Sequence, residues 1–145
     1  MNISRFFSRI NQLKMNKTEL AALRISMLIA ALDGDIAKSE IDAFHTMSEN
    51  CEDYSPKEVE TAFLDTLRAA GYIMVLARVS DRETLLNAFL AEAKKLLPKL
   101  LDFGTGGINT AISLWTGMAK ADGDYSEVEQ EAIRRLKDLI ATMAI

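Results

Sequence analysis

The residues of this chain whose types and spacing suit a chemical role lie in two short acidic elements of the form Asp-Gly-Asp-x4-Glu. The first begins at Asp33 and the second at Asp122. Their acidic members are Asp33, Asp35 and Glu40 in the first copy, and Asp122, Asp124 and Glu129 in the second. Calcium and magnesium take oxygen ligands, which three carboxylates so close in sequence can supply. We therefore predict these six residues as ligands of a divalent metal ion: calcium, magnesium or zinc.

The same residue types also have a purely structural interpretation, which stays open. A glycine after the last apolar residue of a helix accepts the left-handed conformation that ends the helix. Ser126 with Glu129 forms the pattern of a capping box, whereas Ala37 stands at the corresponding place in the first copy. Asp33 and Asp122 distinguish the interpretations best, because the dipole of a helix C-terminus disfavours an acid there.

The elements that must position these residues are expected to be helices throughout. Apolar residues recur at helical spacing along nearly the whole chain. The pattern predicts an all-α fold, a compact bundle of about seven or eight helices in a single domain spanning residues 1–145. Two pseudo-symmetric helix–turn–helix halves are expected around residues 18–50 and 108–143, after an N-terminal helix over residues 2–14.

Cap residues predict where several helices begin. Asn16 followed by Glu19 predicts a capping box for a helix over about 17–32, which is apolar nearly all round and therefore expected at the centre of the bundle. Ser55 before Pro56 predicts the start of another helix. Ser80 is expected to begin the next one.

Glycine and proline predict where helices end or break. Gly71 is expected to end the helix that starts at Pro56, leaving residues 72–79 as a short apolar segment, helical or extended. Pro98 predicts a kink or short break, because proline lacks the amide hydrogen that a helix interior needs. Residues 104–107, rich in glycine, are expected to form a turn.

Charge and composition exclude several classes of function. The 145 residues carry a net charge of −4, which argues against nucleic acid as a partner. No apolar run is long enough to cross a membrane, and we expect a soluble, cytoplasmic protein. Residues 3–17 combine basic and apolar side chains, so they could contact an anionic membrane surface; packing against the bundle is the more common use of such a helix.

The single histidine and the single cysteine give little support to nucleophilic catalysis. His45 is expected on a helix surface, without the nucleophile and partner acid that a catalytic histidine needs. Cys51 stands among acids that disfavour its thiolate, so we expect a partly buried structural thiol.

The acidic elements also carry a resemblance to a known family. Each follows an apolar, alanine-containing helix, Ile29-Ala30-Ala31-Leu32 in one half and Met118-Ala119-Lys120-Ala121 in the other. In this respect the chain resembles the TerB family of tellurite-resistance proteins. The resemblance implies a cytoplasmic all-α fold with internal pseudo-symmetry, an acidic surface that binds divalent metal, and a role in stress responses alongside membrane partners.

The function expected from the sequence is therefore a non-enzymatic TerB-like module of tellurite and stress resistance that binds metal and a protein partner. The alternative is a metal-independent scaffold whose acidic face binds a basic or membrane-associated protein. A hydrolase that uses paired carboxylates is a third class. It would need two carboxyl groups with separated pKa values in one cleft, and no pattern in the sequence marks such a cleft.

Overall fold

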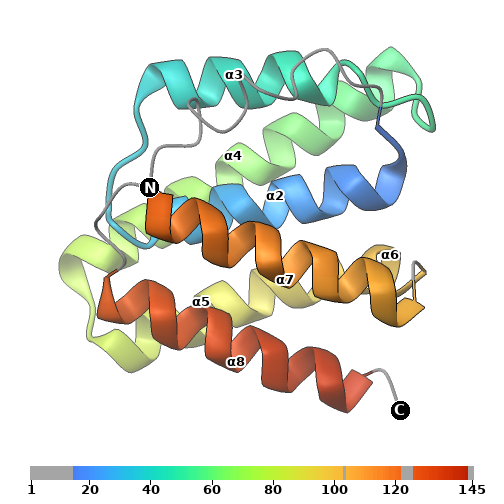
Figure 1. Ribbon diagram of the computed structural model, residues 1–145. Coiled ribbons are helices and arrows are strands. Elements are labelled where there is room, and N and C mark those ends of the chain that lie inside the picture. The colour runs from blue at the N-terminus through green and yellow to red at the C-terminus, as the bar shows by residue number, and fades with distance from the viewer. Residues whose placement is uncertain (1–14, 103, 122–125, 144–145) are drawn as a thin grey trace.

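The structure is a computed structural model that describes residues 15–102, 104–121 and 126–143. Over these residues it contains seven helices and no strand, apart from an isolated bridge between Met15 and Cys51. The helices are α2 (Lys17–Ala31), α3 (Lys38–Ser48), α4 (Pro56–Val79), α5 (Arg82–Lys94), α6 (Leu97–Leu101), α7 (Gly104–Ala121) and α8 (Glu127–Met143). The all-α prediction is confirmed (Figure 1). The helix expected over residues 2–14 lies outside the described residues.

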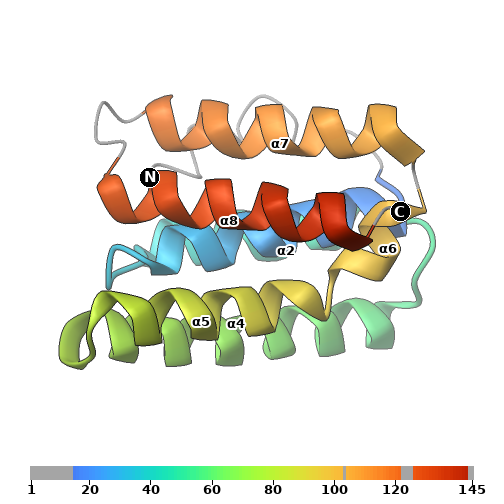
Figure 2. The same ribbon diagram turned by 90° about the horizontal axis from the view of Figure 1, so that it is seen from below.

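Helix α2 forms the centre of the bundle. It contacts α3, α4, α5, α6 and α7, and Figures 1 and 2 show it inside the layers made by these helices. Its side chains are buried on every side, including those of Leu20, Ile25 and Ile29. A helix without a polar face cannot be exposed without leaving apolar surface in water, which is why this segment occupies the interior.

Side-chain caps fix the starts of α2 and α4 as the sequence predicts. The Glu19 backbone nitrogen donates to Asn16 Oδ1 at 2.8 Å, and the Glu58 backbone nitrogen donates to Ser55 Oγ at 3.2 Å. In both cases the glutamate carboxylate accepts a hydrogen bond back from the cap residue. Each cap satisfies amide groups that have no partner within the helix, worth about 1 kcal/mol.

The predicted end of α4 at Gly71 is wrong, because the helix continues to Val79. Gly71 does not have a positive φ, and its neighbours Ala70 and Ile73 are buried in the core. Burial of these residues outweighs the ~1 kcal/mol that glycine costs inside a helix. The segment 72–79 is thus helical, the first of the two interpretations left open for it.

The boundaries between α4, α5 and α7 also differ in part from expectation. Ser80 ends α4, and Asp81 rather than Ser80 caps α5, since the Thr84 backbone nitrogen donates to its carboxylate at 2.7 Å. The break at Pro98 is confirmed: α5 ends at Lys94, and Pro98 lies in the first turn of α6, where proline is tolerated. The predicted turn at residues 104–107 is wrong, because these residues form the first turn of α7.

Candidate cation site at the acidic turns

The ends of α2, α4 and α7 and the starts of α3, α5 and α8 lie at one end of the bundle (left in Figure 1). The two apolar helices α2 and α7 both run toward this end and are in contact. Trp115 of α7 donates a hydrogen bond from Nε1 to the Ala22 carbonyl of α2 at 3.0 Å. The packing of α7 on α2 therefore directs the ends of both apolar helices to the same region.

The first acidic turn has the helix-ending geometry that its glycine predicts. Gly34 has a φ of +84°, and its backbone nitrogen donates to the Ala31 carbonyl at 2.9 Å. Asp33 is exposed at the C-terminus of α2. An acid at this position interacts unfavourably with the helix dipole. The geometry of the turn requires the glycine, but it gives no reason for this acid.

Arg78 is a residue of this turn that the sequence analysis missed. Its Nε donates to the Gly34 carbonyl at 2.9 Å, and its Cγ would lie 3.6 Å from a Cβ placed at Gly34. Arg78 reaches the turn only because α4 continues past Gly71 to Val79. It ties the end of α4 to the first acidic turn and adds one positive charge there.

Ser126 and Glu129 of the second copy form the predicted capping box. Ser126 Oγ accepts from the Glu129 backbone nitrogen at 3.2 Å and donates to Glu129 Oε1 at 3.0 Å. Glu129 Oε1 also accepts from the Ser126 backbone nitrogen at 3.3 Å. Asp122 and Asp124, the other predicted ligands in this copy, lie outside the described residues.

Glu129 is more than a cap, because its carboxylate is completely buried. Its side chain is 0% exposed, and Oε2 has no hydrogen-bond partner within the described part of the chain. Burial raises the pKa of Glu129, and the nearby charge of Asp33 raises it further. An acid from each copy of the element therefore lies close enough to influence the other. A buried carboxylate oxygen without a partner is costly, and a cation would satisfy it.

The remaining acids of the first copy are placed differently. Asp35 is exposed, and Glu40 is half-buried in the first turn of α3. Ala37 gives α3 no side-chain cap, as expected from the absence of a hydroxyl there. Across residues 15–102, 104–121 and 126–143, no group of three or more histidine, cysteine or acidic side chains has a metal-binding arrangement. The six-residue ligand set therefore stays a prediction.

Other acids near the start of α8 form ion pairs with arginines, one from α5 and one from α8 itself. Arg82 lies 3.6 Å from the Glu127 carboxylate and donates to the Glu127 carbonyl at 2.9 Å. Arg135 pairs with Glu131 at 2.9 Å and also binds Glu83, which lies at the start of α5. Glu129 has no such ion pair with a described residue, which sets it apart from its neighbours.

His45 and Cys51 do not form a nucleophilic pair. They line one cavity of about 340 Å³, but no hydrogen bond joins them in the structure as described. His45 Nε2 lies 3.0 Å from the Glu60 carboxylate, and its ring stacks on Phe63. Cys51 is buried, and burial raises the pKa of its thiol. The prediction of a poorly nucleophilic structural thiol agrees with this placement.

Over the described residues the fold is an all-α bundle in which the helix pairs α2–α3 and α7–α8 each flank one copy of the acidic element in the sequence. A family model described as "Tellurite resistance protein TerB" matches residues 19–143. This match covers most of the chain, so the protein belongs to the TerB family. No curated protein and no solved structure matched the chain. Among the described helices, none is both long and apolar enough to cross a lipid bilayer.

Proposed function

We propose that this TerB-family protein is a non-enzymatic module that binds a divalent cation between Asp33 of its first acidic element and Glu129 of its second. The observation that supports this most strongly is the buried Glu129 carboxylate, whose Oε2 has no hydrogen-bond partner among the described residues. Asp33 from the other copy lies close enough to raise the pKa of Glu129. Two hard oxygen donors with mutual repulsion suit calcium or magnesium.

The role of the chain's own residues in such a site follows from their positions. Ser126 holds Glu129 Oε1 through two hydrogen bonds and leaves Oε2 available. Asp33 would face the same cation from the end of α2, with Asp35, Glu40, Asp122 and Asp124 as further candidate ligands. A bound cation would supply the positive charge that cancels this repulsion and would thus order both turns. We propose that a protein partner, in the setting of tellurite or related stress, recognises the ordered surface.

Titration calorimetry with calcium, magnesium, manganese and zinc tests cation binding directly. We expect saturable binding of at least one cation, and a loss of about tenfold or more in affinity for Asp33→Asn and for Glu129→Gln. Asp42→Asn removes an exposed acid from α3 and serves as the matched control, with unchanged affinity. Asp33→Ala combined with Asp122→Ala is expected to abolish binding.

Two outcomes would contradict the proposal: no heat at millimolar metal, or equal losses in the Asp42→Asn control. Association with a basic or membrane-associated protein partner that persists in chelator and weakens with salt would instead favour the metal-independent adaptor. The exposed Asp33 and Asp35 carboxylates supply the acidic surface that this alternative needs.

A further inference from the structure

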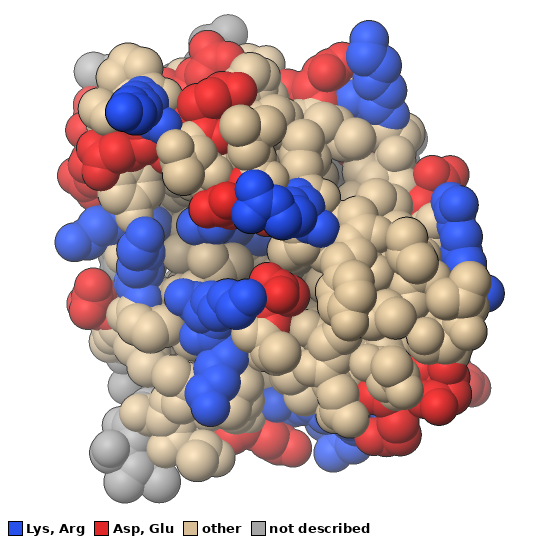
Figure 3. All heavy atoms as spheres, turned by 180° about the vertical axis from the view of Figure 1, so that it is seen from behind, with Lys and Arg blue, Asp and Glu red and all other residues tan. Residues whose placement is uncertain are grey.

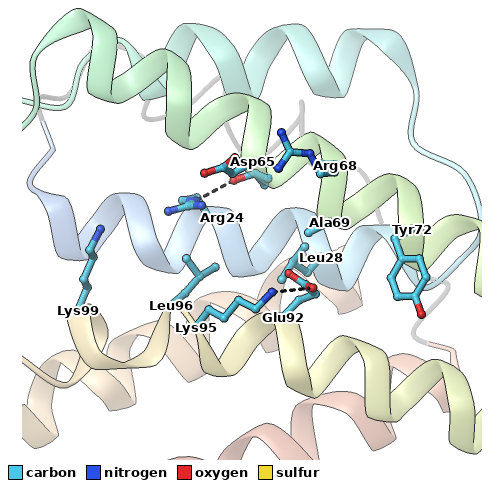
Figure 4. Close-up of a pocket in the computed structure, with 11 residues that line it drawn as sticks. Arg24, Leu28, Asp65, Arg68, Ala69, Tyr72, Glu92, Lys95, Leu96 and Lys99 are labelled. Carbon is cyan, nitrogen blue, oxygen red and sulfur yellow. Dashed lines mark hydrogen bonds and ion pairs between the residues drawn. The ribbon is translucent and has the colours of Figure 1, made fainter.

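The largest cavity described lies away from the acidic turns, between α2, α4 and the α5–α6 region. It has a volume of about 610 Å³, within the roughly 300–1,000 Å³ typical of small-molecule sites (Figure 4). None of the six predicted metal ligands lines it. Its charged lining residues are the cations Arg24, Arg68, Lys95 and Lys99 and the acids Asp65 and Glu92. Positive groups thus outnumber negative ones here, although the whole chain has a net charge of −4.

Two of the four cations are already neutralised by partners in the cavity wall. Arg68 lies 3.5 Å from Asp65, and Lys95 lies 3.1 Å from Glu92. Arg24 and Lys99 are different: over the described residues, neither has a carboxylate within ion-pair distance. The excess positive charge of the cavity is therefore located at Arg24 and Lys99.

Both of these cations are held by neutral contacts. Arg24 Nε donates to Thr66 Oγ1 at 2.7 Å, and that hydroxyl in turn donates to the Ala62 carbonyl at 2.7 Å. Lys99 Nζ lies 5.0 Å from the centre of the Tyr54 ring. Burial lowers the pKa of Arg24, while the charge of Asp65 opposes that change. An anion bound here would offset the desolvation of the guanidinium without requiring the side chain to move far.

The other end of the cavity is apolar and aromatic. Tyr72 lies at the end opposite Lys99, and Leu28 and Ala69 line the wall between the centre and Tyr72, whereas Leu96 lies toward Lys99 (Figure 4). Tyr72 is 55% exposed although it is a large aromatic side chain. Seen from behind, where α4 and α5 lie, the molecule shows basic side chains next to a broad area with few charges (Figure 3). The cavity therefore offers charge at one end and a ring surface at the other.

We infer that this cavity binds a small molecule that carries a phosphate group and an aromatic portion. The phosphate lies between Arg24 and Lys99, since guanidinium and ammonium groups both bind phosphate oxygens through charge-assisted hydrogen bonds. The aromatic portion lies toward Ala69 and Tyr72, where a planar group can pack on the tyrosine ring. The ion pairs of Arg68 and Lys95 line the wall between these two ends.

NMR titration of the ¹⁵N-labelled full chain, in buffer with EDTA, tests the inference independently of metal binding. The probes are inorganic pyrophosphate and ADP. Both should shift the amide signals of α2, α4 and the α5–α6 region saturably, and ADP should bind more tightly because its ring contacts Tyr72. Tyr72→Ala should remove the advantage of ADP while leaving pyrophosphate binding unchanged.

Charge variants identify the phosphate end. Arg24→Gln and Lys99→Gln should each weaken pyrophosphate binding about tenfold or more. Lys94→Gln removes an exposed lysine of α5 that does not line the cavity, and it should bind as the unchanged protein does. Circular dichroism checks folding, and Lys99→Gln carries the test if the half-buried Arg24 cannot be replaced.

Three results would overturn the inference. These are the absence of saturable shifts at about 10 mM pyrophosphate, an equal loss in Lys94→Gln, and binding to phosphatidylglycerol vesicles without binding to either soluble probe. The last result would show a charged surface that attracts phospholipid headgroups rather than an enclosed site for a soluble molecule. Equal affinities for ADP and pyrophosphate would overturn the placement of the aromatic portion.

Discussion

Glu129 combines two roles with opposite effects on stability. Its Oε1 completes a capping box with Ser126, which favours the start of α8. Its Oε2 is buried without a hydrogen-bond partner among the described residues, which disfavours the charged side chain. A glutamine at this position could keep the first role without carrying the buried charge. The stability of the metal-free protein should therefore depend on pH through this one residue.

The pH dependence of unfolding follows from the direction of the Glu129 pKa shift. Burial raises the pKa above 4.5, so between pH 4.5 and the raised pKa the folded state binds more protons than the unfolded state. The contribution of Glu129 to stability must therefore decrease as pH rises through that range. In metal-free urea titrations, Glu129→Gln should be more stable than the unchanged protein at pH 7, and the difference should become smaller toward pH 4.5.

Glu127→Gln is the matched control for this experiment. Glu127 belongs to the same first turn of α8, but its side chain is 89% exposed, so its replacement should change stability little. The Glu129→Gln protein could instead be less stable than the unchanged protein at pH 7 without metal. That result would show that interactions in the folded protein compensate the charge of the Glu129 carboxylate.

At the scale of elements, the same residue type has different effects in different helices. Gly34 has a positive φ and ends α2, whereas Gly71 lies within α4 and does not have a positive φ. A Cβ at Gly71 would meet no atom within 4 Å. The two glycines differ in backbone conformation, and that conformation depends on how the surrounding helix is packed.

Alanine substitutions should separate the two cases. Gly71→Ala should stabilise the protein by about 0.5–1 kcal/mol, since alanine favours the helix interior and has room for its methyl group. Gly34→Ala should destabilise it by about 1 kcal/mol or more, because alanine is strained at φ +84°. Urea unfolding followed by circular dichroism measures both. Equal effects of the two variants would contradict the assignment of their conformations.

At the scale of the whole molecule, α2 connects the parts of the chain that are distant in sequence. Trp115 is 1% exposed, and its hydrogen bond to the Ala22 carbonyl joins α7 to α2. Arg78, from the end of α4, joins that helix to the turn after α2. Both the position of Asp33 near Glu129 and the walls of the 610 Å³ cavity depend on this central helix.

Trp115→Phe tests the contact between α7 and α2. The change removes the indole hydrogen bond and part of a buried ring, so we expect a loss of about 1–3 kcal/mol in the free energy of unfolding. Because tryptophan fluorescence is lost with the residue, far-UV circular dichroism should follow unfolding. Leu64→Ala, at a side chain 51% exposed, is the control and should change stability by less than about 0.5 kcal/mol.

The sequence by itself determined the helical fold class, the duplicated acidic element and most helix starts. These depend on local patterns: apolar spacing, and cap residues such as Asn16 and Ser55 that bond to amides three positions away. The left-handed glycine at Gly34 is equally local. For the same reason, the resemblance to the TerB family could be found from the residues around Asp33 and Asp122 alone.

Only the tertiary structure decided which residues of different elements meet. Whether Gly71 ends a helix depends on the burial of Ala70 and Ile73, and this in turn places Arg78 at the first acidic turn. The burial of Glu129 beside Asp33 and the pairing of Arg24 with Thr66 also join residues far apart in the chain. Desolvation and charge–charge interactions depend on distances in space, and the periodicity of a sequence does not give these distances.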